Sequence, residues 1–388
     1  MKLRIANGRI ALPGGVCDSV SLEIEAGRIR SIARGAGAKA DFDLEGGWLL
    51  PGFIDTQVNG GGGVLFNDDP SVTGISAIGA AHARFGTTSF LPTLISDSPD
   101  RISAALDAVD EAIRDGVPGV IGAHIEGPFI NELKRGIHDS GRIRRLDSQL
   151  MGLLCHPRAG KVLLTLAPEQ CAAEDIARLV AAGVIVSAGH TCATYAEAGA
   201  AIASGMTGFT HLFNAMSPLT HREPGAVGAA FDFPGTWCGL IVDRAHLHDA
   251  TVRLAIRAIG RDRIMLVTDA MPSVGTDLDR FALQGKEIWV RDGVCAYADG
   301  TLAGSDLDMA TAVRNTVAIT GLDVAEAAEM ASRSPAAFLG LSASHGSLLE
   351  GARADWVWLD GNLEVRETWI GGVRHCGGEA GKAKLAAE

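Results

Sequence analysis

Four polar residues each follow directly after a run of apolar residues, where a strand would end: Glu126, His190, His211 and Asp269. A carboxylate and two imidazoles that converge from separate strands resemble a catalytic zinc site, which has three protein ligands and one position open for water. A bound metal ion lowers the pKa of water from about 15.7 to about 7, as the hydrolysis of an amide requires. Asp269 would then take the proton of this water and pass it to the leaving nitrogen. The pattern predicts a metal-dependent amide hydrolase with Glu126, His190 and His211 as metal ligands.

Each of these residues alone also has a structural explanation. A histidine at a strand end is often a hydrogen-bonded structural group, and an aspartate there often caps the next helix. If all four residues were purely structural, however, four such side chains would have to converge on one site by chance. His124 lies one layer deeper than Glu126 on the same strand face, so we expect it to pack inside the barrel. His138 either orients the substrate carbonyl and stabilises its developing charge or is only a loop histidine.

Cationic residues follow two further predicted strands. Arg222 and His246 come after the sixth and seventh strands, so they would surround the same site, and this pair suits a phosphate monoester. A lone surface arginine can equally be solvated. The net charge of −12 argues against a general role on nucleic acid or an anionic membrane, and it leaves an anionic small substrate open.

Eight short β-branched runs between residues 52 and 270 are the elements that would position these groups. They are Gly52–Val58, Thr88–Pro92, Val120–Ile125, Val162–Ala167, Val184–Ala188, Gly208–Thr210, Cys238–Val242 and Ile264–Thr268. Helical segments between and after them are expected at 71–84, 99–114, 173–182, 195–203, 249–259, 306–320 and 325–340. Alternating strands and helices imply parallel pairing, and eight such units close a (β/α)8 TIM barrel, whose active site lies at the C-terminal ends of the strands. We expect residues 218–233 to form a functional loop.

Both ends of the chain contain short alternating segments separated by turns such as Asn7-Gly8 and Ala26-Gly27, which is typical of a small antiparallel sheet. We therefore predict one discontinuous domain from residues 1–50 and 350–388, and a catalytic barrel from residues 51–349.

The first residues contain no apolar run of signal-peptide length, and no segment approaches a membrane span. The seven cysteines are scattered and none forms a CxxC pair, so neither a disulfide framework nor a thiolate zinc site is indicated. We expect a cytoplasmic protein.

Several motifs together resemble those of the N-acetylglucosamine-6-phosphate deacetylases of the amidohydrolase superfamily. They are Pro51-Gly52-Phe53-Ile54-Asp55, Asn59-Gly60-Gly61-Gly62-Gly63, His124-Ile125-Glu126-Gly127-Pro128-Phe129, Ala188-Gly189-His190-Thr191, Thr210-His211-Leu212-Phe213-Asn214-Ala215-Met216, Arg222-Glu223-Pro224-Gly225, Thr268-Asp269-Ala270-Met271 and Leu302-Ala303-Gly304-Ser305. The resemblance covers nearly the whole chain. It implies a TIM barrel with a small β-sandwich domain formed by both termini.

The resemblance also implies roles for individual residues. The acetyl group of N-acetyl-D-glucosamine 6-phosphate would be removed, with Asp269 and His138 as catalytic residues. The resemblance implies substrate contacts from His138, Asn214, Ala215, Arg222 and His246, and we also expect contacts from Ile137, Asp243, Arg244, Leu302, Ala303 and Gly304. Arg222 and His246 would meet the phosphate, and the family is commonly a homodimer in which the partner subunit contributes to the phosphate pocket.

Two positions depart from related sequences. Where many amidohydrolases have His-x-His on the first strand, this chain has Gln57-Val58-Asn59. Neutral amides are poor replacements for imidazole, so we expect one divalent ion per subunit, Zn or Fe, rather than a bridged pair. The other departure is Arg244, where the family usually has Gly. Our hypothesis is that Arg244 adds a phosphate contact, although its bulk could instead reshape the sugar pocket.

Two other functions compete with this one. The first is the same reaction on another substrate, such as N-acetylgalactosamine 6-phosphate or an unphosphorylated N-acyl compound, because Arg222 and His246 do not read the stereochemistry of the sugar. The second is a catalytically inactive barrel that serves as a binding protein.

Overall fold

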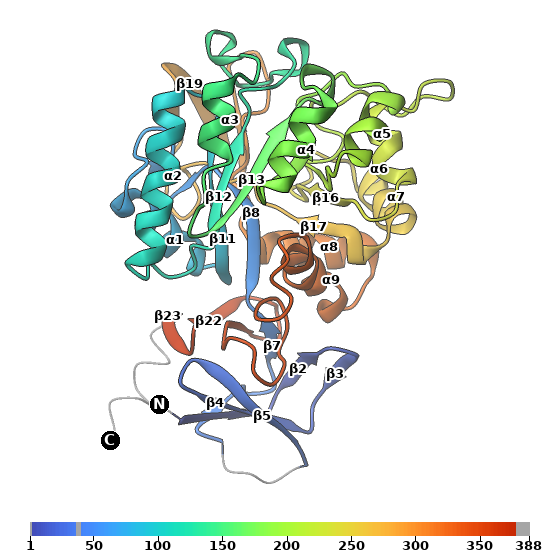
Figure 1. Cartoon of the computed structure of the whole chain (residues 1–388). Helices are drawn as coiled ribbons and strands as arrows, with labels where there is room; N and C mark the ends of the chain where they lie inside the picture. Colours follow the sequence, from blue (N-terminus) through green and yellow to red (C-terminus); the bar gives the residue numbers. More distant parts are fainter. Residues whose placement is uncertain (1, 36–39, 378–388) are drawn as a thin grey trace.

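The computed structural model describes residues 2–35 and 40–377, and its centre is a barrel of eight parallel strands (Figure 1). The strands are β8 (Phe53–Val58), β11 (Thr87–Ile95), β12 (Gly122–Glu126), β13 (Lys161–Leu166), β14 (Ile185–Ala188), β15 (Gly208–Phe209), β16 (Trp237–Leu240) and β17 (Ile264–Leu266). Each is hydrogen-bonded to the next in chain order. The prediction of an eight-stranded TIM barrel is confirmed.

The barrel closes between β8 and the segment that follows β17. The backbone N–H of Asp269 donates to the carbonyl oxygen of Gln57 at 3.0 Å, and Val58 forms a parallel bridge with Ala270. All six residues of β8 are buried, which is expected of a strand covered on both faces. The closure brings the end of the first strand directly beside Asp269.

Helices surround the barrel. They are α1 (Val72–Ala83), α2 (Pro99–Arg114), α3 (Ser148–Leu154), α4 (Ala173–Ala181), α5 (Tyr195–Ala203), α6 (Gly225–Asp232), α7 (Asp249–Ile259), α8 (Met309–Thr320), α9 (Val324–Ala331) and α10 (Arg333–Phe338). In α2, the Ser98 side chain caps the first turn and Pro99 occupies its start. Its residues Ile102, Leu106 and Val109, at helical spacing, are buried.

The structure differs from the sequence prediction in several places, one of which is helix α3, which was not expected. Residues 218–233 are not only a loop, because α6 occupies Gly225–Asp232. The helix expected at 325–340 is two helices, since the backbone leaves the helical region at Ser332. A three-stranded antiparallel sheet was also not anticipated; it consists of β18 (Arg280–Leu283), β19 (Lys286–Arg291) and β20 (Val294–Ala296). A short hairpin, β9 (Gly60–Gly61) with β10 (Val64–Leu65), follows β8.

The two ends of the chain form a second β-rich unit below the barrel (Figure 1). One sheet has the order β5-β4-β1-β6 and the other β23-β22-β21-β7-β2-β3. The strands are β1 (Lys2–Ala6), β2 (Arg9–Leu12), β3 (Gly15–Cys17), β4 (Val20–Glu25), β5 (Arg28–Arg34), β6 (Phe42–Asp43), β7 (Trp48–Pro51), β21 (Trp356–Leu359), β22 (Val365–Ile370) and β23 (Val373–Gly377). Pairing of β7 with β21 joins the N-terminal and C-terminal segments.

An aromatic cluster fills the core of this unit. Trp356 and Trp369 stack with ring centroids 4.9 Å apart, and Phe42 packs edge-on against both. The separate β-rich terminal domain is therefore confirmed, whereas its boundaries at residues 50 and 350 stay a prediction. Residues 378–388 of the predicted second segment lie outside the described residues.

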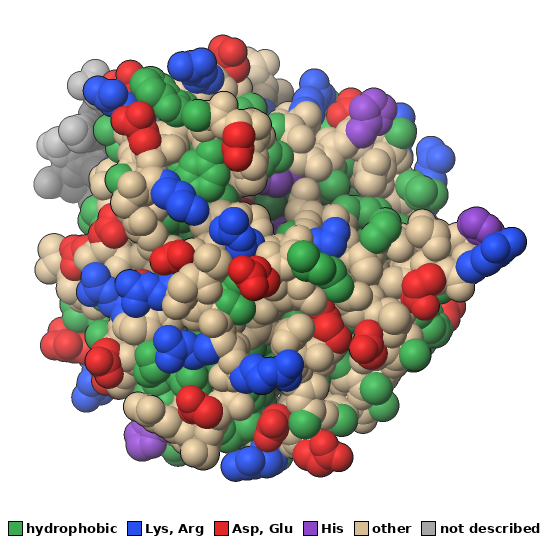
Figure 2. Space-filling model, turned by 90° about the horizontal axis from the view of Figure 1, so that it is seen from above, with side chains coloured by type: hydrophobic (Ala, Val, Ile, Leu, Met, Phe, Trp, Pro, Cys, Tyr) green, Lys and Arg blue, Asp and Glu red, His purple; other side chains and the backbone are tan. Residues whose placement is uncertain are grey.

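The C-terminal ends of the barrel strands point away from the β-rich unit, as the course of β8 in Figure 1 shows. Seen from that side, the molecule is hollowed near the middle, with histidine side chains inside the hollow (Figure 2). None of the helices in the described ranges has the length and apolar character needed to cross a membrane.

Candidate active site

Three ligand atoms converge at the C-terminal mouth of the barrel. Glu126 ends β12, His190 follows β14 and His211 follows β15. Glu126 Oε1 lies 3.4 Å from His190 Nε2 and 3.1 Å from His211 Nε2, and the two nitrogens are 3.0 Å apart. Ligands at the usual distance from a tetrahedral zinc ion lie about 3.3 Å from one another. The triangle therefore fits one face of the coordination sphere of a divalent ion.

A looser candidate metal site shares two of these residues. Glu126, His138 and His190 each offer a ligand atom within 4.8 Å of the others. The atoms of the Glu126, His190 and His211 triangle are closer together, so both sets describe one metal-binding region in which His138 is the more distant imidazole.

The ring of His190 is oriented for binding an ion. Its Nδ1 lies 2.8 Å from the carbonyl oxygen of Lys134, to which it must donate, and this directs Nε2 toward Glu126. Burial alone would raise the pKa of Glu126, but the hydrogen bonds and charges of His190 and His211 outweigh it and hold that pKa well below its usual range. The carboxylate is thus ionised, as a metal ligand must be.

Asp269 lies on the other side of the site and is held by two amides from the end of β8. Its Oδ1 accepts hydrogen bonds from Asn59 Nδ2 at 2.7 Å and from Gln57 Nε2 at 3.0 Å. Burial, followed by the nearby charge of Glu126, raises the pKa of Asp269 to about 7. A carboxyl group with such a pKa can both accept and return a proton near neutral pH.

The backbone is strained at three of the four residues. His190, His211 and Asp269 have φ angles of 50°, 37° and 54°, in the left-handed region that residues with a Cβ seldom adopt. Such conformations persist where surrounding structure imposes them, and they cluster at functional sites. Here each one turns a side chain inward at the point where its strand ends.

His138 is brought to the same site by the loop after β12. Its ring centroid lies 4.3 Å from that of His190, and its Nδ1 lies 2.7 Å from Ser96 Oγ. Burial, followed by the charge of His190, lowers the pKa of His138 well below its usual value. Its imidazole is therefore neutral. His124, by contrast, sits inside the barrel between the hydroxyl groups of Thr93 and Thr165, as expected.

A cavity of about 380 Å³ opens over these groups. Besides the four residues with predicted chemistry, seven predicted substrate-binding residues line it: Ile137, His138, Asn214, Ala215, His246, Leu302 and Gly304. Six further lining residues were not anticipated: Ile95, Leu133, Lys134, Gly136, Ile241 and Thr301. Gly136 and Thr301 are direct neighbours of predicted positions, and Ile95 ends a strand that continues three residues beyond its expected end.

Four predicted contacts do not line this cavity. Asp243 lies behind His246, with Oδ2 at 2.7 Å from Nδ1 of that ring. Burial would lower the pKa of His246, but the hydrogen bond and charge of Asp243 outweigh it and raise that pKa. Ala303 packs in an apolar cluster with Met271. Arg222 and Arg244 are exposed, and Arg244 has a φ of 67°, which explains why glycine suits this position.

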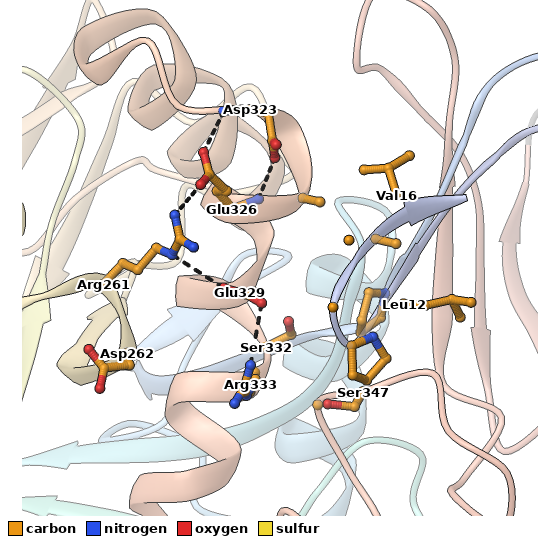
Figure 3. Close-up of a pocket in the computed structure, with 17 residues that line it drawn as sticks. Leu12, Val16, Arg261, Asp262, Asp323, Glu326, Glu329, Ser332, Arg333 and Ser347 are labelled. Carbon is orange, nitrogen blue, oxygen red and sulfur yellow. Dashed lines mark hydrogen bonds and ion pairs between the residues drawn. The ribbon is translucent and has the colours of Figure 1, made fainter. Parts of the chain in front are cut away.

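A larger cavity, of about 590 Å³, lies between the β2–β3 hairpin and α9 (Figure 3). Arg261 forms ion pairs with Glu326 and with Glu329, the latter at 3.5 Å, and Arg333 pairs with Glu329. Its lining contains no histidine or cysteine. None of the residues with predicted chemistry lines it, so the active-site candidate is the smaller cavity.

Comparisons with known proteins agree with this geometry. Residues 48–375 match the model of the amidohydrolase family. The chain is 43% identical to the N-acetylgalactosamine-6-phosphate deacetylase of Shewanella sp. (strain ANA-3), over 95% of each chain. It is 38% identical to the human N-acetylglucosamine-6-phosphate deacetylase, over 92% of this chain and 89% of that one.

Solved structures give the same result. The N-acetylglucosamine-6-phosphate deacetylase of Pasteurella multocida superposes with a TM-score of 0.93 at 34% identity, over 96% of this chain and 99% of that one. The corresponding enzyme of Mycobacterium smegmatis, in a mutant form in complex with N-acetyl-D-glucosamine-6-phosphate, has a TM-score of 0.89 at 32% identity, over 96% of this chain and 99% of that one. The chain therefore belongs to the amidohydrolase family.

Proposed function

We propose that this protein removes the acetyl group of N-acetyl-D-glucosamine 6-phosphate and releases glucosamine 6-phosphate and acetate. The observation that carries the proposal is the single cavity in which Glu126, His190 and His211 meet Asp269. The names of the human and Pasteurella multocida relatives support this substrate. The buried carboxyl group of Asp269 beside three metal-ligand atoms favours an enzyme over a non-catalytic binding protein.

Glu126, His190 and His211 would hold one divalent ion, Zn or Fe. Such an ion supplies a polarised carbonyl and a more acidic water. Asp269 accepts a proton from the water that attacks the acetyl carbon, and a C–O bond forms. Asp269 then gives this proton to the amide nitrogen as the C–N bond breaks, which leaves acetate and a free amine.

Neighbouring residues would position the substrate. His138 is placed to meet the acetyl carbonyl oxygen as negative charge develops on it. Ile137, Asn214, Ala215, Leu302, Ala303 and Gly304 would shape the space around the sugar. Asp243 would act indirectly, because its contact with His246 favours the cationic imidazole.

The phosphate would be bound at the His246 end of the cavity. Arg222 stands on the loop before α6, which projects away from the barrel at the upper right of Figure 1. We propose that the protein is a homodimer and that this loop carries Arg222 to the cavity of the other subunit.

We also propose a cytoplasmic location for the protein. A phosphorylated sugar is charged and is retained within cells, which supports this location.

N-acetylgalactosamine 6-phosphate is the second candidate substrate. The relative from Shewanella, at 43% identity, carries that name. The two sugars differ only in the orientation of one hydroxyl group, which the charged groups of the site do not distinguish.

Acetate release from a panel of sugars tests the proposal. We expect turnover of N-acetylglucosamine 6-phosphate and much slower turnover of free N-acetylglucosamine, because the free sugar lacks the phosphate that His246 and Arg222 would bind. A higher kcat/KM for the galactosamine ester would select the second candidate. Equal turnover of free and phosphorylated sugars would refute the proposed phosphate site.

A further inference from the structure

Ser96 is a buried hydroxyl group that contacts the site without lining its cavity. It follows β11 directly and is 1% exposed. Its Oγ lies 2.7 Å from Nδ1 of His138 and 3.3 Å from the carbonyl oxygen of Glu126. The hydroxyl therefore stands between a metal-ligand candidate and the histidine expected to meet the substrate carbonyl.

Other segments fix the position of Ser96. Gln284, in the turn between β18 and β19, donates from Nε2 to the Ser96 carbonyl oxygen at 2.9 Å. Asn67 bonds to both the N–H and the carbonyl of Ile95, at 3.0 and 2.8 Å. These contacts hold the end of β11 at a defined depth, so the Ser96 hydroxyl cannot move far from the His138 ring.

The loop that carries His138 leaves room for this hydroxyl. A Cβ added at Gly127 would lie 2.2 Å from Ser96 Oγ, and Gly127 has a φ of 81°. Any other residue at this position would be strained and would displace the serine side chain. The absence of a side chain at Gly127 thus allows the contact between Ser96 and His138.

The proton on the Ser96 hydroxyl has two acceptors within reach. An O–H···O bond is usually about 2.7–2.8 Å long, so the 3.3 Å separation from the Glu126 carbonyl is a weak contact. The 2.7 Å separation from His138 Nδ1 is that of a good hydrogen bond. Donation to Nδ1 requires a lone pair on that nitrogen, so the ring proton is then on Nε2, the nitrogen at the other end of the ring.

We propose that Ser96 is a positioning residue that donates to His138 Nδ1 and so keeps an N–H on Nε2 that faces the cavity. This inference rests on the proposed deacetylation, because an Nε2 N–H can stabilise an oxyanion and a lone pair there cannot. If Ser96 instead donated to Glu126, His138 would present a lone pair and could serve only as an acceptor or a metal ligand.

The tautomer can be measured directly by NMR on zinc-loaded protein labelled with 15N at histidine, with His138→Gln used to assign the signals. We expect Nδ1 of His138 to be unprotonated and Nε2 to be protonated. A protonated Nδ1 in the unsubstituted protein would overturn the inference. Because this readout does not depend on turnover, it also separates a failure of the inference from a failure of the proposed function.

Kinetics give a second test. In Ser96→Ala, we expect kcat to fall about tenfold to a hundredfold, as is usual when a group that orients a site residue is lost, with KM nearly unchanged. Ser103→Ala, at a half-buried site on α2 that does not line the cavity, is the matched control and should keep full activity. An unchanged kcat in a folded Ser96→Ala variant would overturn the inference.

Discussion

Gln57 donates a hydrogen bond from Nε2 to Oδ1 of Asp269, over 3.0 Å. The same nitrogen lies 2.9 Å from Glu126 Oε1, so both hydrogens of the amide are directed at carboxylates. A metal ion could not approach this nitrogen, which has no lone pair to offer. The end of β8 therefore binds the carboxylate of Asp269 by hydrogen bonds, at the strand end where many amidohydrolases carry His-x-His.

Metal content follows from this arrangement. Protein purified without added metal and dialysed should retain about one equivalent of divalent ion per chain, because the two candidate ligand sets share residues of one metal-binding region. Elemental analysis by mass spectrometry measures it. Two equivalents retained through dialysis would contradict the single-ion site.

The pH dependence of activity should respond to Asn59. Asp269 must be ionised to accept a proton, and the hydrogen bond from Asn59 lowers its pKa against the larger effects of burial and Glu126, which raise it. In Asn59→Ala, the acid limb of the kcat/KM profile should therefore move to higher pH. An acid limb that stays in place or moves to lower pH would show that this hydrogen bond does not stabilise the ionised form.

Asp55 should make the stability of the fold depend on pH. Burial raises the pKa of Asp55 from its usual 3.8 to about 7, against opposing hydrogen bonds from Thr268 and Gln57. Because the folded-state pKa is the higher one, this group stabilises the fold below pH 3.8, and the contribution is lost as pH rises to about 7. The slope is at most about 1.4 kcal/mol per pH unit.

Thermal unfolding of the parent protein and of Asp55→Asn at pH 5 to 8 tests this. The Tm of the parent relative to the variant should fall across that range and level off above pH 7. A difference that is constant with pH would mean that Asp55 is ionised throughout.

Arg244 offers a test of the phosphate end. If it contacts the phosphate, Arg244→Gly should raise KM for a 6-phosphorylated sugar with little change in kcat, and the glycine should accept the φ of 67° without strain. The ratio of KM values for phosphorylated and free sugar isolates the effect. An unchanged KM would mean that the Arg244 side chain is solvated and does not contact the phosphate.

Much of the architecture was predictable from local patterns. The eight barrel strands were recognisable because each is a short apolar run bounded by polar residues, and α2, α5 and α7 have the bounds expected from their sequences. Helix α6 was missed because Gly225–Ala230 are all buried, so the sequence lacks the polar face of an ordinary surface helix.

The β18–β20 sheet was missed although a signal existed. Its two turns, Gln284-Gly285 and Asp292-Gly293, have positive φ at both residues, and Asp-Gly between alternating residues is typical of a hairpin.

The candidate site was only partly predictable from the sequence. Ser96 was overlooked because β11 extends to Ile95, and the strained backbone at His190, His211 and Asp269 depends on tertiary contacts rather than on local sequence.

In the proposed mechanism, Asp269 moves protons while Glu126, His190 and His211 hold the ion. The most direct measurement is acetate release from N-acetylglucosamine 6-phosphate by the parent and by Asp269→Asn, with metal content measured on the same samples. The variant should retain its metal and lose about a hundredfold to ten-thousandfold in kcat, since an amide cannot carry the proton. Full activity in the metal-loaded variant would contradict the account.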